Sequence, residues 1–254
     1  MLDSFTLPLA AADLLGEELR LDLRRFPFEV PHFAATFDER RALRERMWAD
    51  LEQRNLAYRG QVEAEVEQAL SLLDRAAVSI AVAVYETGAD DVFRARIAAA
   101  GRTGVLAVQD PRGFQVRFLD VRGLARQCAE LVPDEPAGRL EAASVLVPAE
   151  PEAQQEESEE RGPRWLDYGP TTSTGGRDAE RAAAIMALPV RRLGYFLISG
   201  PSGQAPAIGF RDTEQGRYSM TTRRNQDGQR WNTFAGADRA TLQRHLDEHL
   251  ARFR

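Results

Sequence analysis

The sequence predicts a mixed α/β (α+β) fold. We expect a quasi-twofold repeat of helix, antiparallel four-strand meander and helix, with a central antiparallel sheet flanked by helical bundles. Residues 77–119 hold four short runs rich in branched and aromatic residues, joined by short turns, which is typical of an antiparallel meander. Residues 193–234 hold four more such runs. Helical patterns precede and follow each group, so both halves have the same order of elements, although few residues are identical between them.

The first residues predict a strand, a helix and an extended segment. Phe5–Leu7 is a short strand candidate, and residues 10–21 carry leucines at helical spacing. Residues 26–31 cannot form a helix because prolines bracket them. Their apolar residues alternate, so we expect an extended segment at a sheet edge.

Two helices are predicted before the first long strand. Thr36 and Glu39 have the spacing of a capping box, which marks a helix start. The helix that follows places Leu43, Met47 and Leu51 on one face. Residues 61–73 repeat this pattern, so the two segments predict a helical hairpin that leads into the sheet.

The first long strand, residues 77–86, predicts a sheet with two unequal faces. Branched residues fall at every second position, and small residues lie between them. We expect the small-residue face to lie beneath helices or to receive a partner. Three further strands are predicted to begin at Phe93, Val105 and Phe114.

The middle of the chain separates the two halves. Residues 121–132 predict a helix with Cys128 facing inward, and residues 144–147 predict a strand. Residues 148–161 are acidic and lack a large apolar side chain, which predicts a flexible loop. We therefore divide the chain into an N-terminal half (1–147), a flexible acidic loop (148–176) and a C-terminal half (177–254), with both halves in one compact domain.

The second half repeats the order of the first. Arg177 to Leu188 predicts a helix. Four strands follow, at residues 193–199, 207–211, 217–222 and 230–234. A closing helix over residues 238–253 turns its leucines inward.

Composition excludes several classes of function. The net charge is −6 with a pI near 5.3, which argues against nucleic-acid binding because phosphate binding requires a basic face. All 33 basic residues are Arg, and without Lys there is no P-loop. A single cysteine excludes an intramolecular disulfide. We see no membrane span and no signal peptide, so we expect a cytoplasmic protein.

One short string resembles a metal site. His245, Glu248 and His249 match H-x-x-E-H, in which two histidines hold a zinc ion and the glutamate holds a water. The leucines of this helix define its buried face and leave the histidines on its flank, so a solvated helix face is the preferred interpretation. A zinc-dependent hydrolase is kept as an alternative. We expect no catalytic, cofactor-binding or metal-binding residues.

The order of several strings resembles the EspG family, the ESX secretion-associated proteins of actinobacterial type VII secretion. The resemblance covers essentially the full length, the acidic loop least. The strings that carry it are Thr36-Phe37-Asp38-Glu39-Arg40, Leu51-Glu52-Gln53-Arg54-Asn55-Leu56, Gly104-Val105-Leu106-Ala107-Val108, Gly216-Arg217-Tyr218 and Trp231-Asn232-Thr233-Phe234.

This resemblance implies a cytosolic, non-enzymatic chaperone. Members of the family hold the apolar tip of a helical PE–PPE substrate pair, keep it soluble and release it at the secretion machine. The implied partner is a helical secreted protein or a PE–PPE-like heterodimer, with transient contact with the secretion machinery. A self-associating structural protein that uses exposed sheet edges is a further alternative.

The resemblance also implies where the partner binds. The contacts of the family fall on the loop Glu86 to Asp91, the strand starting at Phe93 and the helix Arg177 to Leu188. The implied partner-binding residues are Glu86, Asp90, Asp91, Phe93, Ile185 and Met186. This chain departs from the family in having a short first loop. The two aspartates would supply charge at the rim of an apolar groove.

Overall fold

The computed structural model describes residues 2–147 and 176–253. The chain forms two compact units: unit 1 contains Met1–Ala81 and Phe93–Leu124, and unit 2 contains Val82–Val92 and Ala125–Arg254. Strand β4 (Val78–Glu86) begins in unit 1 and ends in unit 2. The predicted acidic loop lies outside the described residues apart from Gly176.

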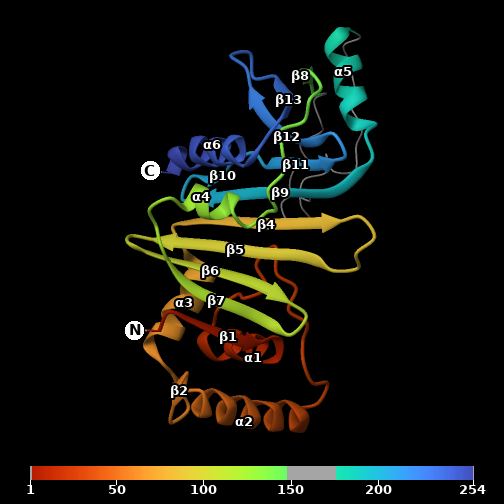
Figure 1. The fold of residues 1–254 in the computed structure, drawn as a ribbon. Coiled ribbons are helices and arrows are strands. Elements are labelled where there is room, and N and C mark those ends of the chain that lie inside the picture. The colour runs from red at the N-terminus through yellow and green to blue at the C-terminus, as the bar shows by residue number, and fades with distance from the viewer. Residues whose placement is uncertain (1, 148–175, 254) are drawn as a thin grey trace. The chain divides into compact units, whose positions relative to one another are not determined.

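The strands form an antiparallel sheet of eleven strands, which confirms the predicted fold class (Figure 1). The strand order is β1-β7-β6-β5-β4-β9-β11-β12-β13-β8, and β10 pairs with β9. Four consecutive strands lie side by side in each predicted meander. The element order α3-β4-β5-β6-β7-α4 in the first half returns as α5-β9-β11-β12-β13-α6 in the second, apart from the short β10. The predicted repeat of pattern is therefore present.

Unit 1 holds the first meander. Its strands besides β4 are β1 (Ser4–Pro8), β5 (Val92–Ala100), β6 (Thr103–Asp110) and β7 (Gly113–Asp120). β5, β6 and β7 pair in sequence order, and β1 pairs with β7. Gly113 faces Pro8 across this last pair, and a Cβ there would lie 2.1 Å from the carbonyl oxygen of Leu7. Only glycine allows this close approach of the two strands.

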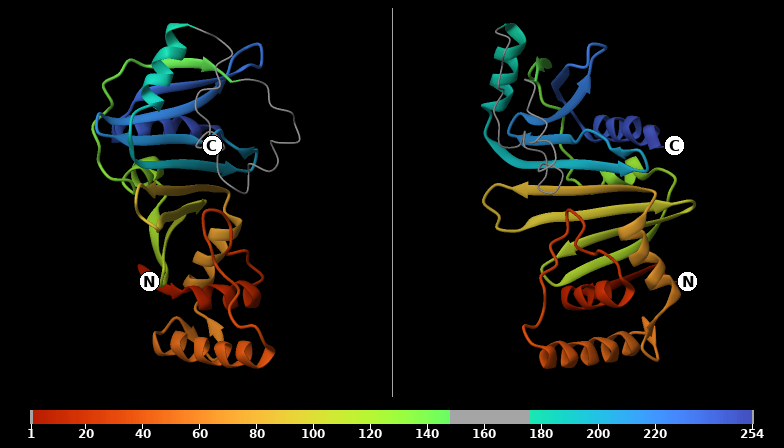
Figure 2. Two further views of the ribbon diagram at one scale, coloured as in Figure 1. Left: turned by 90° about the vertical axis from the view of Figure 1, so that its right-hand side faces the viewer. Right: turned by 180° about the vertical axis from the view of Figure 1, so that it is seen from behind.

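Three helices cover the sheet of unit 1. They are α1 (Leu9–Leu19), α2 (Phe37–Gln53) and α3 (Ala64–Arg75). α1 lies between the sheet and α2 in all three ribbon views (Figures 1 and 2). Their apolar faces and one face of β1, β6 and β7 form a single core, which includes the fully buried Leu7, Leu15, Leu51 and Leu70. The predicted stripes of α2 and α3 therefore pack inward.

The predicted capping box at the start of α2 is confirmed. The Thr36 hydroxyl accepts from the Glu39 amide at 3.3 Å, and the Glu39 carboxylate accepts from the Thr36 amide at 3.1 Å. These bonds hold the pKa of Glu39 below its ordinary value. The cap fixes where the helix begins because it satisfies amides that have no partner inside the helix.

Two predictions in this region were wrong. Residues 26–31 form turns and irregular chain instead of an edge strand, and the Phe26–Pro27 peptide bond is cis. Their alternation arises because Phe28 and Val30 fill the core of unit 1. Residues 61–62 are not helical: they form β3 (Gln61–Val62), which pairs with β2 (Ala57–Tyr58) in a short hairpin between α2 and α3.

The small-residue face of β4 is buried. Ser79, Ala81 and Ala83 are as buried as the branched residues between them. At Ser79 the small side chain leaves room for Arg96, whose Nη2 donates to the Ser79 hydroxyl at 3.0 Å. Arg96 also donates to the carbonyl oxygens of Leu73 and Phe26, and burial lowers its pKa to about 10. In unit 1 this face therefore anchors an arginine.

Unit 2 holds the second meander, as predicted. Its strands are β8 (Ala143–Leu146), β9 (Val190–Gly200), β10 (Gly203–Gln204), β11 (Ile208–Thr213), β12 (Gly216–Arg224) and β13 (Arg230–Gly236). Its helices are α5 (Arg177–Met186), α6 (Arg239–Leu250) and a terminal 3-10 turn (Ala251–Phe253). α4 (Leu124–Ala129) is shorter than the predicted helix, and Cys128 is buried in it as predicted.

α5 and α6 lie against opposite faces of the second meander. Ala182 and Ile185 of α5 pack with Tyr218, Met220 and Phe234 of the strands. α6 meets the other face, where Phe253 next to it lies against Gly200. No helix in the described part of the chain is long and apolar enough to span a membrane.

Candidate partner-binding site

Unit 2 brings together two of the segments expected to bind a partner. The Thr87 amide in the β4–β5 loop donates to the carbonyl oxygen of Arg191 at 2.9 Å, and its hydroxyl donates to that of Val190 at 2.7 Å. Val190 begins β9, four residues after the end of α5 at Met186. The loop therefore lies beside the chain that leaves the C-terminal end of α5.

The loop presents acidic side chains to solvent. Glu86, Asp90 and Asp91 are all exposed. Glu86 pairs with Arg192 at 3.2 Å, whereas no ion pair of either aspartate occurs among the described residues. Gly88 has a φ of 84°, which suits a tight turn. The loop thus offers fixed negative charge close to the start of β9.

The other three predicted residues differ in burial. Phe93 is half-buried in β5 and belongs to unit 1. Ile185 is fully buried in the core of unit 2, so its side chain already has its contacts. Met186 is half-buried at the C-terminal end of α5. Of these three residues, Met186 is the one beside an open pocket.

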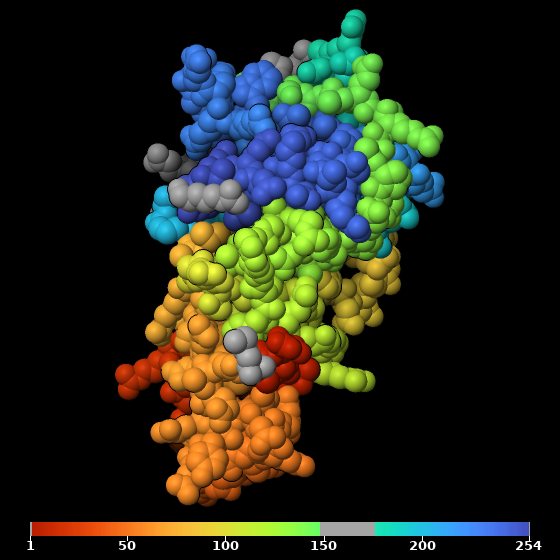
Figure 3. Space-filling view, turned by 60° about the vertical axis from the view of Figure 1, so that its left-hand side comes forward, coloured from red at the N-terminus to blue at the C-terminus, as the bar shows by residue number. Residues whose placement is uncertain are grey.

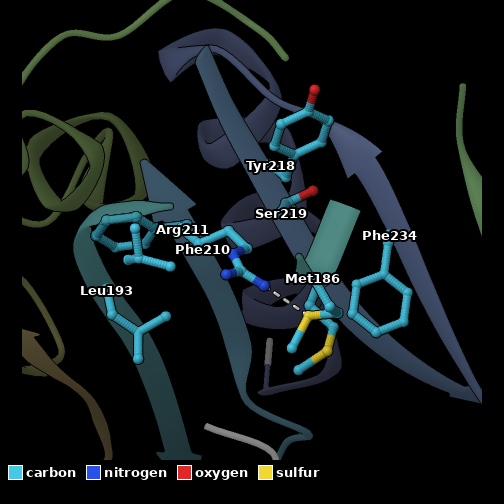
Figure 4. A pocket seen from close by; sticks show the side chains of 9 residues that line it. Met186, Leu193, Phe210, Arg211, Tyr218, Ser219 and Phe234 are labelled. Carbon is cyan, nitrogen blue, oxygen red and sulfur yellow. Dashed lines mark hydrogen bonds between the residues drawn. The ribbon is translucent and has the colours of Figure 1, made fainter. Parts of the chain in front are cut away.

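This pocket lies between α5 and the sheet of unit 2 and has a volume of about 90 Å³ (Figure 4). Its lining is mostly apolar: Met186, Val190, Leu193, Phe210, Arg211, Tyr218, Ser219, Met220 and Phe234. Met186, Val190 and Leu193 are partly exposed and form the mouth, whereas the aromatic residues are buried and form the floor. The mouth therefore lies where the β4–β5 loop meets β9.

A single cation faces into this lining. Arg211 is 8% exposed, and Figure 4 shows its guanidinium directed at Met186 between the strands and α5. Nη1 donates to the Met186 sulfur at 2.7 Å and Nη2 to the Leu188 carbonyl oxygen at 3.3 Å, while Nε is buried and finds no partner in the described part of the chain. Burial lowers the pKa of Arg211. Its position complements the C-terminal end of α5, which carries partial negative charge.

The opposite face of the same strands carries a paired charge network. Asp212 is fully buried and accepts from Arg217 at 2.6 and 2.9 Å and from Arg192 at 2.9 Å. Arg192 also pairs with Glu86 of the β4–β5 loop, and Arg191 pairs with Glu135 at 3.0 Å. Burial opposes the charged form of Arg192, but the Asp212 carboxylate outweighs it and raises the pKa. The loop is therefore tied to the core through alternating charges.

The family model of the EspG family matches residues 8–248. The chain belongs to the EspG family. No match was found among curated proteins. Among solved structures, the chain is similar to the Mycobacterium tuberculosis type VII secretion chaperone EspG5, whose structure was determined in complex with the PE25–PPE41 dimer. The sequence identity is 16%, the TM-score is 0.63, and the match covers 97% of this chain and 95% of that chain.

In this EspG-family chain the H-x-x-E-H string does not gather at one point. His249 is 5% exposed and packs inward, which differs from the predicted solvated flank. Glu248 points to the surface, where Arg223 and Arg244 pair with it at 3.0 and 3.1 Å. α6 lies on the surface of unit 2 in Figure 3. No group of three metal-binding side chains occurs among the described residues.

Sequence reasoning missed Arg211 and Asp212. Both lie in β11, whose residues are all buried, whereas the predicted strand ends at Arg211. The available signal was that two charged residues stand next to each other in a strand. Neighbouring strand residues point to opposite faces, and each face of this strand carries a helix, so both charges are expected to be covered. The identity of their partners depends on strand register, which local sequence does not encode.

Proposed function

We propose that this protein is a cytosolic chaperone of type VII (ESX) secretion. It binds the apolar helical tip of a PE–PPE-like heterodimer and keeps that tip soluble for export. The observation that carries the proposal is the EspG family match over residues 8–248, which includes the β4–β5 loop, α5 and the whole second meander. The likeness in fold to a chaperone solved with a PE–PPE dimer supports it.

The β4–β5 loop and the C-terminal end of α5 are the proposed contact surface. An apolar helix tip needs an apolar pocket with a polar rim, because burial supplies the affinity and charges set the orientation. The mouth at Met186, Val190 and Leu193 provides the apolar part. Glu86, Asp90 and Asp91 provide the rim. Phe93 stays a predicted contact on unit 1, and Ile185 is expected to support α5 from beneath.

Co-expression tests the function directly. The chain is produced with pairs of small helical proteins encoded beside its gene, each pair with and without the chain. We expect one pair to become soluble only with the chain and to co-purify as a complex in size-exclusion chromatography. Partners that are equally soluble alone, or that never co-purify, contradict the proposal.

The rim is tested by charge reversal. Asp90→Arg combined with Asp91→Arg is expected to weaken partner binding at least tenfold, because it replaces two exposed negative charges at the rim while leaving the core unchanged. The matched control is Glu45→Arg with Glu67→Arg, two exposed residues on α2 and α3 of unit 1. Isothermal titration gives the affinities. Equal losses in both variants would show a general charge effect and exclude the loop as the rim.

A further inference from the structure

Arg211 is a buried cation whose charge no carboxylate matches among the described residues. Its two hydrogen bonds go to the Met186 sulfur and the Leu188 carbonyl oxygen, which are both neutral acceptors. A thioether sulfur is a weak acceptor, and a carbonyl oxygen lacks the charge that strengthens an arginine hydrogen bond. Nε has no hydrogen-bond partner among residues 2–147 and 176–253.

The neighbouring buried arginines show what this protein otherwise does with such charges. Arg217 is fully buried and Arg192 is 15% exposed in its side chain, and both share the Asp212 carboxylate. Asp212 is the residue next to Arg211, on the opposite face of β11. Arg211 has instead an open cavity beside it, lined by apolar side chains. A buried charge without a counter-charge is unfavourable, so a site of this kind calls for an anion.

The size of the cavity limits what can enter. Its volume of about 90 Å³ is well below the range of roughly 300–1,000 Å³ typical of cofactor and metabolite pockets. One side chain fits this space. The partly exposed mouth opens next to the β4–β5 loop, on the proposed contact surface.

We propose that the Arg211 pocket accepts one acidic side chain, Asp or Glu, which the partner protein presents among apolar residues. This inference rests on the proposed function, because it names one chemical feature of the helix tip that is bound. The carboxylate accepts hydrogen bonds from Arg211, and its apolar neighbours contact Met186, Val190 and Leu193. The acid thereby gives specificity to an otherwise apolar contact, because a buried ion pair tolerates little change of geometry.

The first test uses a small carboxylate and needs no partner. The chain has four methionines, of which Met186 and Met220 line the pocket and Met47 lies in the core of unit 1. With ¹³C-labelled methionine methyl groups, NMR spectra are recorded while isovalerate is added. Isovaleramide, the uncharged amide of the same shape, is added in a parallel titration.

We expect saturable shifts of the Met186 and Met220 signals with isovalerate only, at millimolar affinity, while the Met47 signal stays in place. Arg211→Gln should abolish the shifts, and Arg211→Lys should retain a weaker response because it keeps the charge. Arg224→Gln, an exposed arginine on β12, is the matched control and should respond like wild type. No shift, equal shifts with the amide, or shifts that survive Arg211→Gln would overturn the proposal.

The second test uses the complex found by co-expression. Arg211→Gln should weaken that complex at least tenfold, and substitution of one Asp or Glu at the helix tip by its amide should cause a similar loss that is not additive with Arg211→Gln. If wild type forms no complex, the proposed function fails, while the isovalerate titration still judges the pocket. Additive losses would overturn the proposal. A further control replaces the glutamates of residues 150–160 by glutamine and records the Met186 and Met220 signals without ligand. If these signals move, the chain's own acidic segment is the occupant, and the proposal is overturned.

Discussion

Asp13 shows how one buried carboxylate can organise a region of irregular chain. It is 1% exposed in α1, and it accepts from Arg24, from Arg40 at 2.9 Å and from the Phe33 amide at 3.0 Å. These donors come from the segment before α2 and from α2 itself. Burial raises the pKa of Asp13, but the Arg40, Phe33 and Arg24 hydrogen bonds outweigh it, so the pKa lies below its ordinary value.

We therefore predict that Asp13→Asn destabilises the protein by about 3–5 kcal/mol, because it leaves two arginines without their buried counter-charge. Asp50→Asn is the control: Asp50 pairs with Arg54 on the exposed side of α2, and its loss should cost less than about 1 kcal/mol. Urea unfolding of both variants measures the difference. The lowered pKa also means that the Asp13 contribution is present above the ordinary pKa of 3.8 and is lost as pH falls through the folded pKa. Equal effects of the two substitutions would contradict this role.

His249 makes stability depend on pH in a higher range. Burial, and then the positive charges of Arg252 and His245, lower its pKa from 6.5 to about 4. The folded chain thus keeps His249 neutral where the unfolded chain protonates it, so stability falls as pH drops from about 6.5 toward 4. We predict that His249 contributes about 2 kcal/mol of the stability lost between pH 7 and pH 5. His249→Leu should lose that much less over the same interval in urea titrations. Parallel profiles for variant and wild type would exclude His249 as the source.

At the scale of elements, Asp212 joins three strands and a loop. It accepts from Arg192 of β9 and from Arg217 of β12, and Arg217 also donates to the carbonyl oxygen of Pro133 at 2.9 Å. The backbone of Arg217 exchanges further hydrogen bonds with the chain at Pro136 and Gly138. The network therefore fixes the chain that leads to β8 onto the second meander.

A double-mutant cycle should reveal this coupling. Asp212→Asn alone is predicted to destabilise by about 3–5 kcal/mol, since it leaves the fully buried Arg217 without its carboxylate and removes one of the carboxylates that pair with Arg192. Asp212→Asn combined with Arg217→Met should cost about 1–3 kcal/mol less than the sum of the single changes. Asp247→Asn, on the exposed side of α6, is the control for loss of one carboxylate. Additive free energies of unfolding would show that Asp212 and Arg217 act independently.

Helices and strands were predictable where the pattern of their own residues indicates them. All eight strands of the two meanders were found because short runs rich in branched and aromatic residues, separated by turn-forming residues, are a local signal. The Thr36–Glu39 cap was found because both partners lie within one turn. β2 and β3 were missed because two residues each are too few to show a period. The segment at Phe26–Val30 misled because alternating apolar residues also arise in irregular chain that touches a core.

The candidate site belongs to the scale of the whole molecule, and sequence could predict it only in part. The loop Glu86 to Asp91 and the helix after Arg177 were expected separately, through family resemblance. Their proximity comes from the bonds between Thr87 and residues 190–191, which are more than 100 positions away in the chain. Arg211 was missed for the same reason: its isolation is set by what the register of β9, β11 and β12 places around it. Such long-range pairing leaves no local trace in composition or period.

Binding of a partner to the folded chain alone should raise the stability of the whole molecule. At a partner concentration of about 100 times the dissociation constant, mass action contributes about 2.7 kcal/mol, which corresponds to a melting temperature several degrees higher. Differential scanning fluorimetry over a partner dilution series measures this shift. Without partner, Arg211→Gln should melt near the wild-type temperature, because it removes a buried charge that no carboxylate of the described residues matches. With partner, its melting temperature should rise less than that of wild type. An unrelated helical protein at equal concentrations reports the small effect of crowding. A melting temperature that does not depend on partner concentration would mean that the partner does not bind selectively to the folded state.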